Sequence, residues 1–166
     1  MSDEYSSEKF EVEVLVDPRT GRIVGERWRG QHGGFDRPGD LPAYVDYSPE
    51  TGEQTYARWH KEGALHRDGD KPATLVTRPG SGIVVCEQYA ILGHVHREAD
   101  QPAMIMRDDQ GRLEEHSFHR HGDLHREGGP AVERFSVKTG RLLKREFWLN
   151  GRQQDGPDTY QAPSFE

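Results

Sequence analysis

The chain has 166 residues, the length of one domain, and its 29 acidic residues outnumber 22 lysines and arginines, which leaves a net charge of -7. This acidic balance disfavours nucleic acid and anionic membranes as partners, and the single cysteine, Cys86, excludes an internal disulfide and a cysteine-built zinc site. The 19 glycines and 10 prolines are spread along the chain, which predicts many turns and short elements.

Residues 1–9, MSDEYSSEK, are expected to form a flexible N-terminal segment. They lack the basic start and the apolar stretch of a secretory signal peptide. No apolar run in the chain approaches the roughly 18 residues that a membrane span requires. We therefore expect a cytoplasmic protein that does not associate with membranes.

From residue 10 onward the chain alternates between apolar and polar residues, as Val12 and Val14 do against Glu11 and Glu13. A period of two is typical of half-buried strands. Five turn sequences that end on glycine separate such strands: DPRTG (17–21), SPETG (48–52), RPGSG (78–82), DDQG (108–111) and VKTG (137–140). Each turn with its two flanking strands predicts a hairpin.

A second landmark recurs between these turns. Three segments share an aromatic residue, a glycine four positions later, His-Arg and Pro-Ala: WHKEGALHRDGDKPATLV from Trp59, YAILGHVHREADQPAMIM from Tyr89 and FHRHGDLHREGGPAVERF from Phe118. Degenerate copies begin at Trp28 and Phe147, so the aromatic residues recur every 29 to 31 residues. This self-similarity indicates a repeat architecture.

These landmarks predict an all-β fold, an antiparallel meander of about five β-hairpin repeats with a period of about 30 residues. The meander is expected to form a single-layer curved sheet, or open solenoid, over residues 10–160, followed by a C-terminal tail at 161–166. It leaves open sheet edges through which the chain could form homo-oligomers.

The repeated residues have distinct structural roles in this prediction. The glycines that follow each aromatic residue reverse the chain: Gly63, Gly93, Gly122 and Gly151. The small residues that follow each proline leave room for an aromatic ring of a neighbouring hairpin: Ala43, Ala73, Ala103 and Ala131. The aromatic residues are expected to stack in a row one hairpin apart and to form the core: Trp28, Trp59, Tyr89, Phe118 and Phe147.

Three histidines, His66, His96 and His125, occupy the same position in their repeats, which indicates a structural role. We expect each imidazole to bond a backbone carbonyl group. The arginine that follows each histidine is expected to pair with the next acidic residue (Asp68, Glu98 or Glu127) or with a neighbouring turn. Because equivalent positions lie two strands, about 10 Å, apart, the three histidines cannot share one metal ion.

His119 and His121 are a separate metal candidate, because alternate residues of a strand point to one face and His94 could join them across a hairpin. No carboxylate or cysteine supports them at a suitable spacing, so no metal or cofactor is expected. The chain also has no glycine-rich phosphate loop and no paired carboxylates, and Cys86 is interpreted as a small buried apolar residue. We expect no enzyme activity, and a metal-dependent enzyme that uses His119 and His121 remains an alternative.

Several residues are candidates for contact with a partner protein. Acidic residues are expected to be accessible at the turns: Asp17, Glu50, Asp108 and Asp109 at the half-period turns, and Glu62 at the opposite edge. Trp148 follows Phe147 in a strand and must point to the opposite face. There it is either an exposed aromatic contact or packed under the tail at 152–166. The aromatic row itself is expected to be core, with an exposed aromatic groove as the alternative.

The repeats at 59–73, 89–103 and 118–131 resemble the MORN-type repeat, and more closely its variant in antitoxin-like proteins, although their period is longer than that of ordinary MORN repeats. The resemblance implies a non-enzymatic scaffold that binds other proteins. We therefore expect an immunity or antitoxin-like protein that neutralises a basic toxin by binding and occluding it. The alternative is a structural or assembly repeat protein, phage-borne or envelope-associated, that bridges other components.

Overall fold

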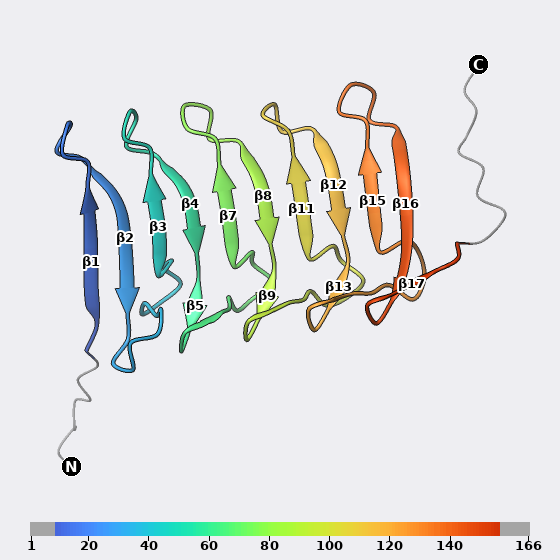
Figure 1. The fold of residues 1–166 in the computed structure, drawn as a ribbon, viewed down its shortest axis with the longest axis horizontal. Helices are drawn as coiled ribbons and strands as arrows, with labels where there is room; N and C mark the ends of the chain where they lie inside the picture. The colour runs from blue at the N-terminus through green and yellow to red at the C-terminus, as the bar shows by residue number, and fades with distance from the viewer. Residues whose placement is uncertain (1–8, 157–166) are drawn as a thin grey trace, which may run out of the picture.

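A computed structural model describes residues 9–156 of the chain, and within them all regular structure is β-structure. Eleven strands form one antiparallel sheet in the order β1-β2-β3-β4-β7-β8-β11-β12-β15-β16-β17, so that neighbours in the sheet follow one another along the chain (Figure 1). The sheet does not close on itself. These findings confirm the predicted all-β meander, and no helix in the described range is long and apolar enough to cross a membrane.

Ten strands form five hairpins, one in each repeat: β1 (Glu11–Val16) with β2 (Ile23–Arg29), β3 (Tyr44–Tyr47) with β4 (Gln54–Arg58), β7 (Thr74–Thr77) with β8 (Val84–Gln88), β11 (Met104–Arg107) with β12 (Leu113–Ser117), and β15 (Val132–Phe135) with β16 (Leu142–Leu149). Shorter hairpins extend them: β5 (His60–Lys61) with β6 (Ala64–Leu65), β9 (Ala90–Ile91) with β10 (His94–Val95), β13 (His119–Arg120) with β14 (Asp123–Leu124), and the end of β16 with β17 (Arg152–Gln154). The boundaries expected at 160 and 161, and all of the expected N-terminal segment except Lys9, lie outside the described residues.

The half-period turns use their final glycine as the sequence predicts. Each has a positive φ that only glycine adopts without strain: Gly21 (69°), Gly52 (76°), Gly82 (67°), Gly111 (79°) and Gly140 (71°). The strand register shifts by one residue beside every one of these turns, as it does between Leu15 and Val16. A repeated β-bulge of this kind increases the local twist of the hairpin.

Each short hairpin turns at two residues, of which the second is a glycine. In the first of them Glu62 and Gly63 both have positive φ, 51° and 85°, which is the conformation of a type I′ turn. The same combination recurs at Leu92–Gly93, His121–Gly122 and Asn150–Gly151. The glycine N–H of each turn donates to a carbonyl group of the preceding repeat, as Gly93 does to Leu65 at 2.9 Å. These glycines therefore reverse the chain, as predicted, and also join successive repeats.

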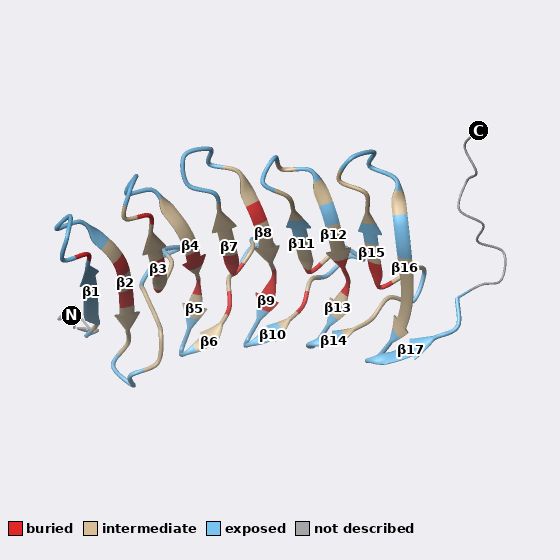
Figure 2. Cartoon of the chain, turned by 45° about the horizontal axis from the view of Figure 1, so that its top comes forward, coloured by how far each residue is buried: buried red, intermediate tan, exposed pale blue. Residues whose placement is uncertain are grey.

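The core lies where the long strands meet the short hairpins (Figure 2). Trp59, Tyr89 and Phe118 are each less than a tenth exposed, and the alanines that open the strands beside them are completely buried. The expected row of aromatic residues is present, but no ring contact within residues 9–156 joins two of its members. Equivalent residues lie two strands apart, about 10 Å, which exceeds the separation of contacting rings. Trp28 and Phe147, at the two ends of the row, are only half-buried.

The two faces of the sheet differ. The face that carries the aromatic row, the aromatic face, also carries the alanines and the connecting segments. The opposite face, the open face, carries one cross-strand row that runs through Tyr56, Val76, Cys86 and Met106. The prediction that Cys86 is buried is wrong, because its side chain on the open face is only half-buried. Burial is nevertheless sufficient to raise the pKa of the thiol.

Candidate functional site

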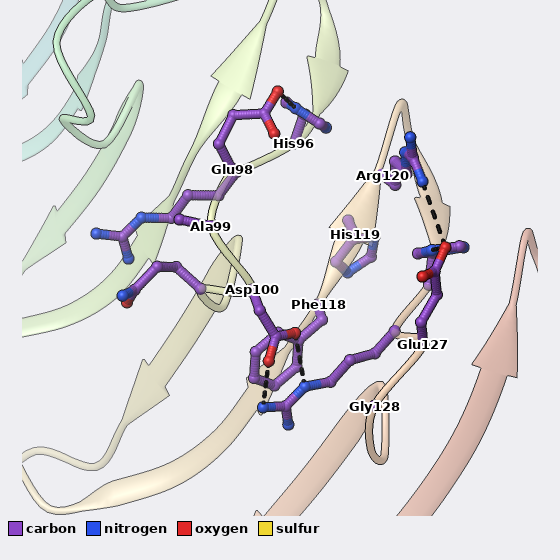
Figure 3. Close-up of a pocket in the computed structure, with 13 residues that line it drawn as sticks. His96, Glu98, Ala99, Asp100, Phe118, His119, Arg120, Glu127 and Gly128 are labelled. Carbon is purple, nitrogen blue, oxygen red and sulfur yellow. Dashed lines mark hydrogen bonds and ion pairs between the residues drawn. The ribbon is translucent and has the colours of Figure 1, made fainter.

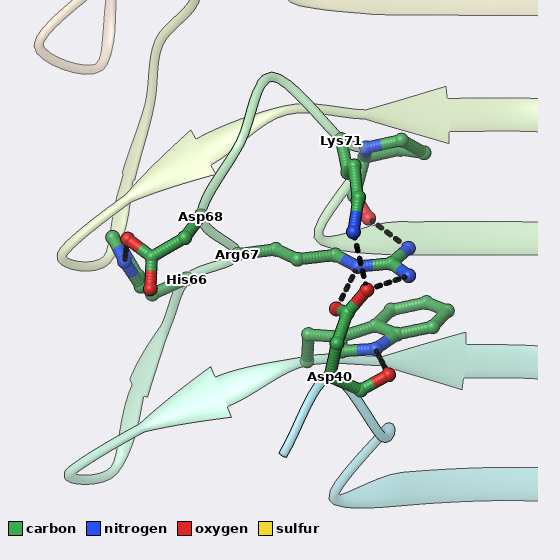
Figure 4. Close-up of polar contacts among 7 residues, drawn as sticks. Asp40, His66, Arg67, Asp68 and Lys71 are labelled. Atoms are coloured by element: carbon green, nitrogen blue, oxygen red, sulfur yellow. Dashed lines mark hydrogen bonds and ion pairs between the residues drawn. The ribbon is translucent and has the colours of Figure 1, made fainter.

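The segments that lead into β3, β7, β11 and β15 are the first to fourth connectors, residues 30–43, 66–73, 96–103 and 125–131. Arg67 of the second connector has three kinds of contact (Figure 4). Its guanidinium carbon lies 3.7 Å from the centre of the Trp59 ring, and Nη1 donates to the Pro72 carbonyl at 3.2 Å. Nε and Nη2 of Arg67 donate to the two carboxylate oxygens of Asp40 at 2.6 and 3.0 Å. Asp40 belongs to the preceding connector, so this arginine holds its own ring and ties two repeats together.

The same arrangement recurs along the array. Arg97 donates to both oxygens of Asp70 at 2.7 and 3.1 Å, and Arg126 donates to both oxygens of Asp100 at 2.9 Å. Each guanidinium again lies 3.7 Å from the ring centre of its own repeat. We refer to the pairs Asp40–Arg67, Asp70–Arg97 and Asp100–Arg126 as the arginine ladder. The expected pairing of each arginine with the following acidic residue is wrong. The expected alternative was a neighbouring turn, and the partner is an aspartate of the preceding connector.

The ladder ends in a different way on each side. Within the described residues Arg37 of the first connector pairs with no earlier repeat, and its Nη1 lies 3.3 Å from Glu26 of the same repeat. Within the fourth connector, Gly129 stands where the other connectors have their aspartate, and in the fifth repeat Asp155 stands where the next arginine would be. Both members of a fourth pair are thus replaced together, so the pairing is specific to three junctions.

The repeated histidines also join neighbouring repeats. Nδ1 of His66 accepts a hydrogen bond from the Leu92 amide at 3.2 Å, in the type I′ turn of the next repeat, and His96 and His125 accept equivalent bonds from His121 and Asn150. The expected bond to a carbonyl group is wrong, because each imidazole accepts a hydrogen bond from the amide of that turn. With Nδ1 as acceptor, Nε2 carries the proton and faces the following acid, at 2.9 Å for His66 and Asp68.

These contacts favour the charged form of the carboxylates. The Arg67 guanidinium, with Lys71, holds the pKa of Asp40 well below its usual range, and Arg97 lowers the pKa of Asp70. Hydrogen bonds from His66 and His96 lower the pKa of Asp68 and Glu98 respectively. The connectors are therefore built from paired charges at neutral pH.

The His-x-His segment does not form the expected convergent pair. His121 lies in a type I′ turn with φ 52°, so strand alternation does not apply to it, and its ring stacks on His96 with 4.7 Å between ring centres. The Nε2 atom of His119 instead lies 3.0 Å from the Ser117 hydroxyl, and burial lowers the pKa of its ring. His94 is exposed. The described residues contain no group of three or more histidine, cysteine or acidic side chains arranged to hold a metal ion.

A cleft of about 430 Å³ lies between the third and fourth connectors (Figure 3). Its charged side chains pair with one another: Arg126 with Asp100, His96 with Glu98, and Arg120 with Glu127 at 3.7 Å. The floor includes the ring of Phe118. Because these groups belong to the arginine and histidine contacts that recur along the array, the cleft is a part of the scaffold.

The acidic residues expected at the turns differ in accessibility. Asp17 is only 8 % exposed, because its carboxylate accepts hydrogen bonds from the Arg19 amide and the Thr20 hydroxyl inside the turn, so the expectation that a partner could reach it is wrong. Asp108 is similarly engaged by Arg112. Exposed positions are occupied by Glu50, Glu62 and Asp109, the last within 2.6 Å of Arg78.

Trp148 lies on the open face, opposite Phe147, as strand alternation predicts. It is half-buried, and its indole N–H donates to Glu146 at 3.2 Å. The segment after β17 packs on the other side of the strand, where Gly156 lies so close to the Phe147 ring that a Cβ atom would come within 2.6 Å of it. Within the described residues the tail therefore packs on Phe147.

The open face carries a cluster of tyrosine and arginine side chains that the sequence interpretation missed. Arg27 stacks on the Tyr44 ring with 3.3 Å to its centre, and Tyr44 meets Tyr56 edge to face at 5.7 Å. Arg58 lies over Tyr56, and its buried Nε atom has no hydrogen-bond partner in the described chain. These four residues, Arg27, Tyr44, Tyr56 and Arg58, are the tyrosine–arginine cluster. The alternate positions of YVDY and TYAR on neighbouring strands are the signal that would have revealed it.

Three comparisons with known proteins, against family models, curated proteins and solved structures, found no match to this chain.

Proposed function

We propose that the protein is a non-enzymatic binding module of the immunity or antitoxin-like type, which neutralises a cognate basic toxin by binding and occluding it. The observation that carries the proposal is the tyrosine–arginine cluster on the open face. Tyrosine, tryptophan and arginine are the residues that most often dominate the binding energy of protein interfaces. The MORN-like, antitoxin-like repeat pattern of the connectors supports the same class of function.

The surroundings of the cluster suit a protein partner. A shallow cleft of about 530 Å³ includes Tyr44, Tyr56 and Arg58 together with the apolar side chains of Val76 and Pro79. Paired contacts behind the face, above all the arginine ladder, hold the repeats in a fixed arrangement. A rigid surface loses little conformational entropy on binding, which favours affinity. The exposed acids Glu50 and Asp109 then attract a basic partner by charge.

The test begins with affinity purification from the source organism, with the wild-type chain as bait. The captured protein should arrest growth when it is expressed alone, and co-expression of the chain should restore growth. Tyr56→Ala should fail to restore it, whereas Lys138→Ala, at an exposed turn of the fifth hairpin, should behave like the wild type. A captured protein that is harmless to cells would overturn the proposal.

The second candidate function is that of an assembly repeat protein that bridges larger components. It is favoured by the open sheet, whose first and last strands leave backbone groups that other strands can bind. Neighbouring genes distinguish the two candidates, because a toxin gene favours neutralisation and structural genes favour assembly.

A further inference from the structure

The first strand of the sheet is exposed in a way that the interior strands are not. All six residues of β1 are exposed, and its valines, Val12, Val14 and Val16, are 43 %, 47 % and 52 % accessible. Val45 lies in the same cross-strand row as Val14, two strands further into the sheet, and is 1 % exposed. The valine of this cross-strand row is thus buried inside the array, at Val45, and exposed to solvent at the first strand, at Val14.

The backbone of β1 is open at the same positions. The Trp28 amide donates to the Ala43 carbonyl, so the backbone N–H and C=O groups of residues 26 and 28 in β2 point toward β3. The backbone groups of Arg27, between them, point toward β1. Arg27 is the partner of Glu13, which places the N–H and C=O groups of Glu13 and Leu15 toward β2. The alternate residues Val12, Val14 and Val16 therefore direct their backbone groups outward, where the described chain has no strand to receive them.

The sequence of β1 is complementary to itself in one register. If two β1 strands run antiparallel about a twofold axis at Val14, Val14 meets its counterpart and Val12 meets Val16 of the second copy. On the other face, Glu13 then lies opposite Leu15 of the second copy. An axis at Glu13 would bring two glutamates face to face at the centre of the pairing, which like charges disfavour, and an axis at Leu15 would place Val12 opposite Pro18, beyond the end of the strand. The axis at Val14 places Glu11 opposite Asp17 at each end, where the Asp17 carboxylate already accepts hydrogen bonds from the Arg19 amide and the Thr20 hydroxyl.

We propose that the protein forms a symmetric dimer in which the β1 strands of two copies pair antiparallel about Val14 and join two sheets into one. The pairing forms about six backbone hydrogen bonds and covers six valine side chains. Of the two glutamates at the junction, Glu11 lies opposite Arg29 of β2, which offsets part of their negative charge, whereas Arg27, opposite Glu13, is paired with Asp46. The dimer does not depend on the proposed toxin binding, which uses the open face and the turns.

The first test is the mass of the full chain in solution, measured by sedimentation velocity over a broad range of concentration. We expect a monomer–dimer equilibrium. Val14→Lys places two lysines across the axis and should raise the dimer dissociation constant by more than about 100-fold. Leu143→Lys, on β16 at the other end of the sheet and 69 % exposed, should leave it unchanged. Circular dichroism checks that both variants keep the fold.

The second test reads the register directly by oxidation of single-cysteine variants in a Cys86→Ser background. Val14→Cys should form a covalent dimer, because the two Cα atoms at the axis are about 5.5 Å apart, within the span of a disulfide. Glu13→Cys should not. A chain that is monomeric at all concentrations, an assembly larger than a dimer, a dimer that survives Val14→Lys, or cross-linking through Glu13→Cys instead of Val14→Cys would each overturn the proposal.

Discussion

Arg97 and Asp70 are joined by two parallel hydrogen bonds across the boundary between two repeats, although 26 residues separate them in the chain. The arginine lies on Tyr89 of its own repeat, while the aspartate belongs to the preceding one. Each ladder pair thus connects the core of one repeat to the aspartate side chain of its neighbour's connector. Its two members should differ in their contributions to stability.

Arg97→Ala should cost about 2–3 kcal/mol of unfolding free energy, because it removes the stacking on Tyr89 and the bond to the Pro102 carbonyl as well as the ion pair. Asp70→Ala should cost no more than about 1 kcal/mol, because its carboxylate is well exposed and the pair is screened by solvent. Urea denaturation of both single variants and the double variant measures the coupling. Equal losses for the two single variants would contradict this assignment.

Trp59→Ala and Phe118→Ala should each destabilise the chain by about 3–5 kcal/mol, because each ring fills the gap between the sheet and its connector. Trp28→Ala provides the comparison. Its ring is half-buried, and within the described residues no connector precedes it, so the loss should be clearly smaller. Thermal unfolding followed by circular dichroism is sufficient. Unchanged melting temperatures for Trp59→Ala and Phe118→Ala would show that the aromatic face is not the core.

His96→Ala should destabilise the chain by about 1–3 kcal/mol, because the buried imidazole no longer accepts the His121 amide. The exposed His94 is the matched control, and His94→Ala should be neutral. Metal analysis of untagged protein should show the same content for both variants and the wild type. A loss of bound metal that accompanies only His96→Ala would point to a metal site in place of the structural role.

Acid should weaken the fold through the connector carboxylates. The pKa of Asp70 and that of Glu98 are lower in the folded than in the unfolded chain, so the unfolded chain binds more protons as the pH falls. Their contribution is complete above their unfolded pKa values, near pH 4, and is lost as the pH falls through the folded ones. The melting temperature should therefore decrease as the pH is lowered below about 4. The Asp70→Asn variant should show a shallower decrease than the wild type, and parallel curves would contradict the linkage.

In the proposed toxin complex, exposed charges should act on the association rate and the aromatic contact on the dissociation rate. Glu50→Lys with Asp109→Lys should slow association and reduce its dependence on salt, with little change in dissociation, because exposed rim charges act mainly on encounter. Trp148→Ala should act on dissociation instead, since an aromatic anchor can be worth about 2 kcal/mol. Surface plasmon resonance at two salt concentrations measures both effects. Association that is indifferent to salt would favour the assembly function.

The sequence was sufficient to predict the hairpin array, because its signals are local. A positive-φ glycine such as Gly52 or Gly93 and a two-residue alternation each act within a few residues. The ladder was not predictable in this way, because the first three connectors each offer two carboxylates, such as Asp68 and Asp70, and only the distance between adjacent connectors decides which one meets an arginine. The burial of Asp17 could have been predicted from the sequence, although we expected this residue to be accessible. An aspartate that begins a turn commonly accepts amide hydrogen bonds within that turn.

The replacement of the fourth ladder pair by Gly129 and Asp155 has a consequence for the order in which the molecule opens. In an array where each unit contacts only its neighbours, the junction with the fewest ties separates first. The junction after the fourth connector keeps the hydrogen bonds from the Asn150 amide to His125 and from the Arg126 amide to the Trp148 carbonyl, but it has no arginine–aspartate pair. Fraying should therefore start at β17 and the lower half of β16. In a hydrogen-exchange time course, deuterium should enter there before it reaches the three laddered junctions.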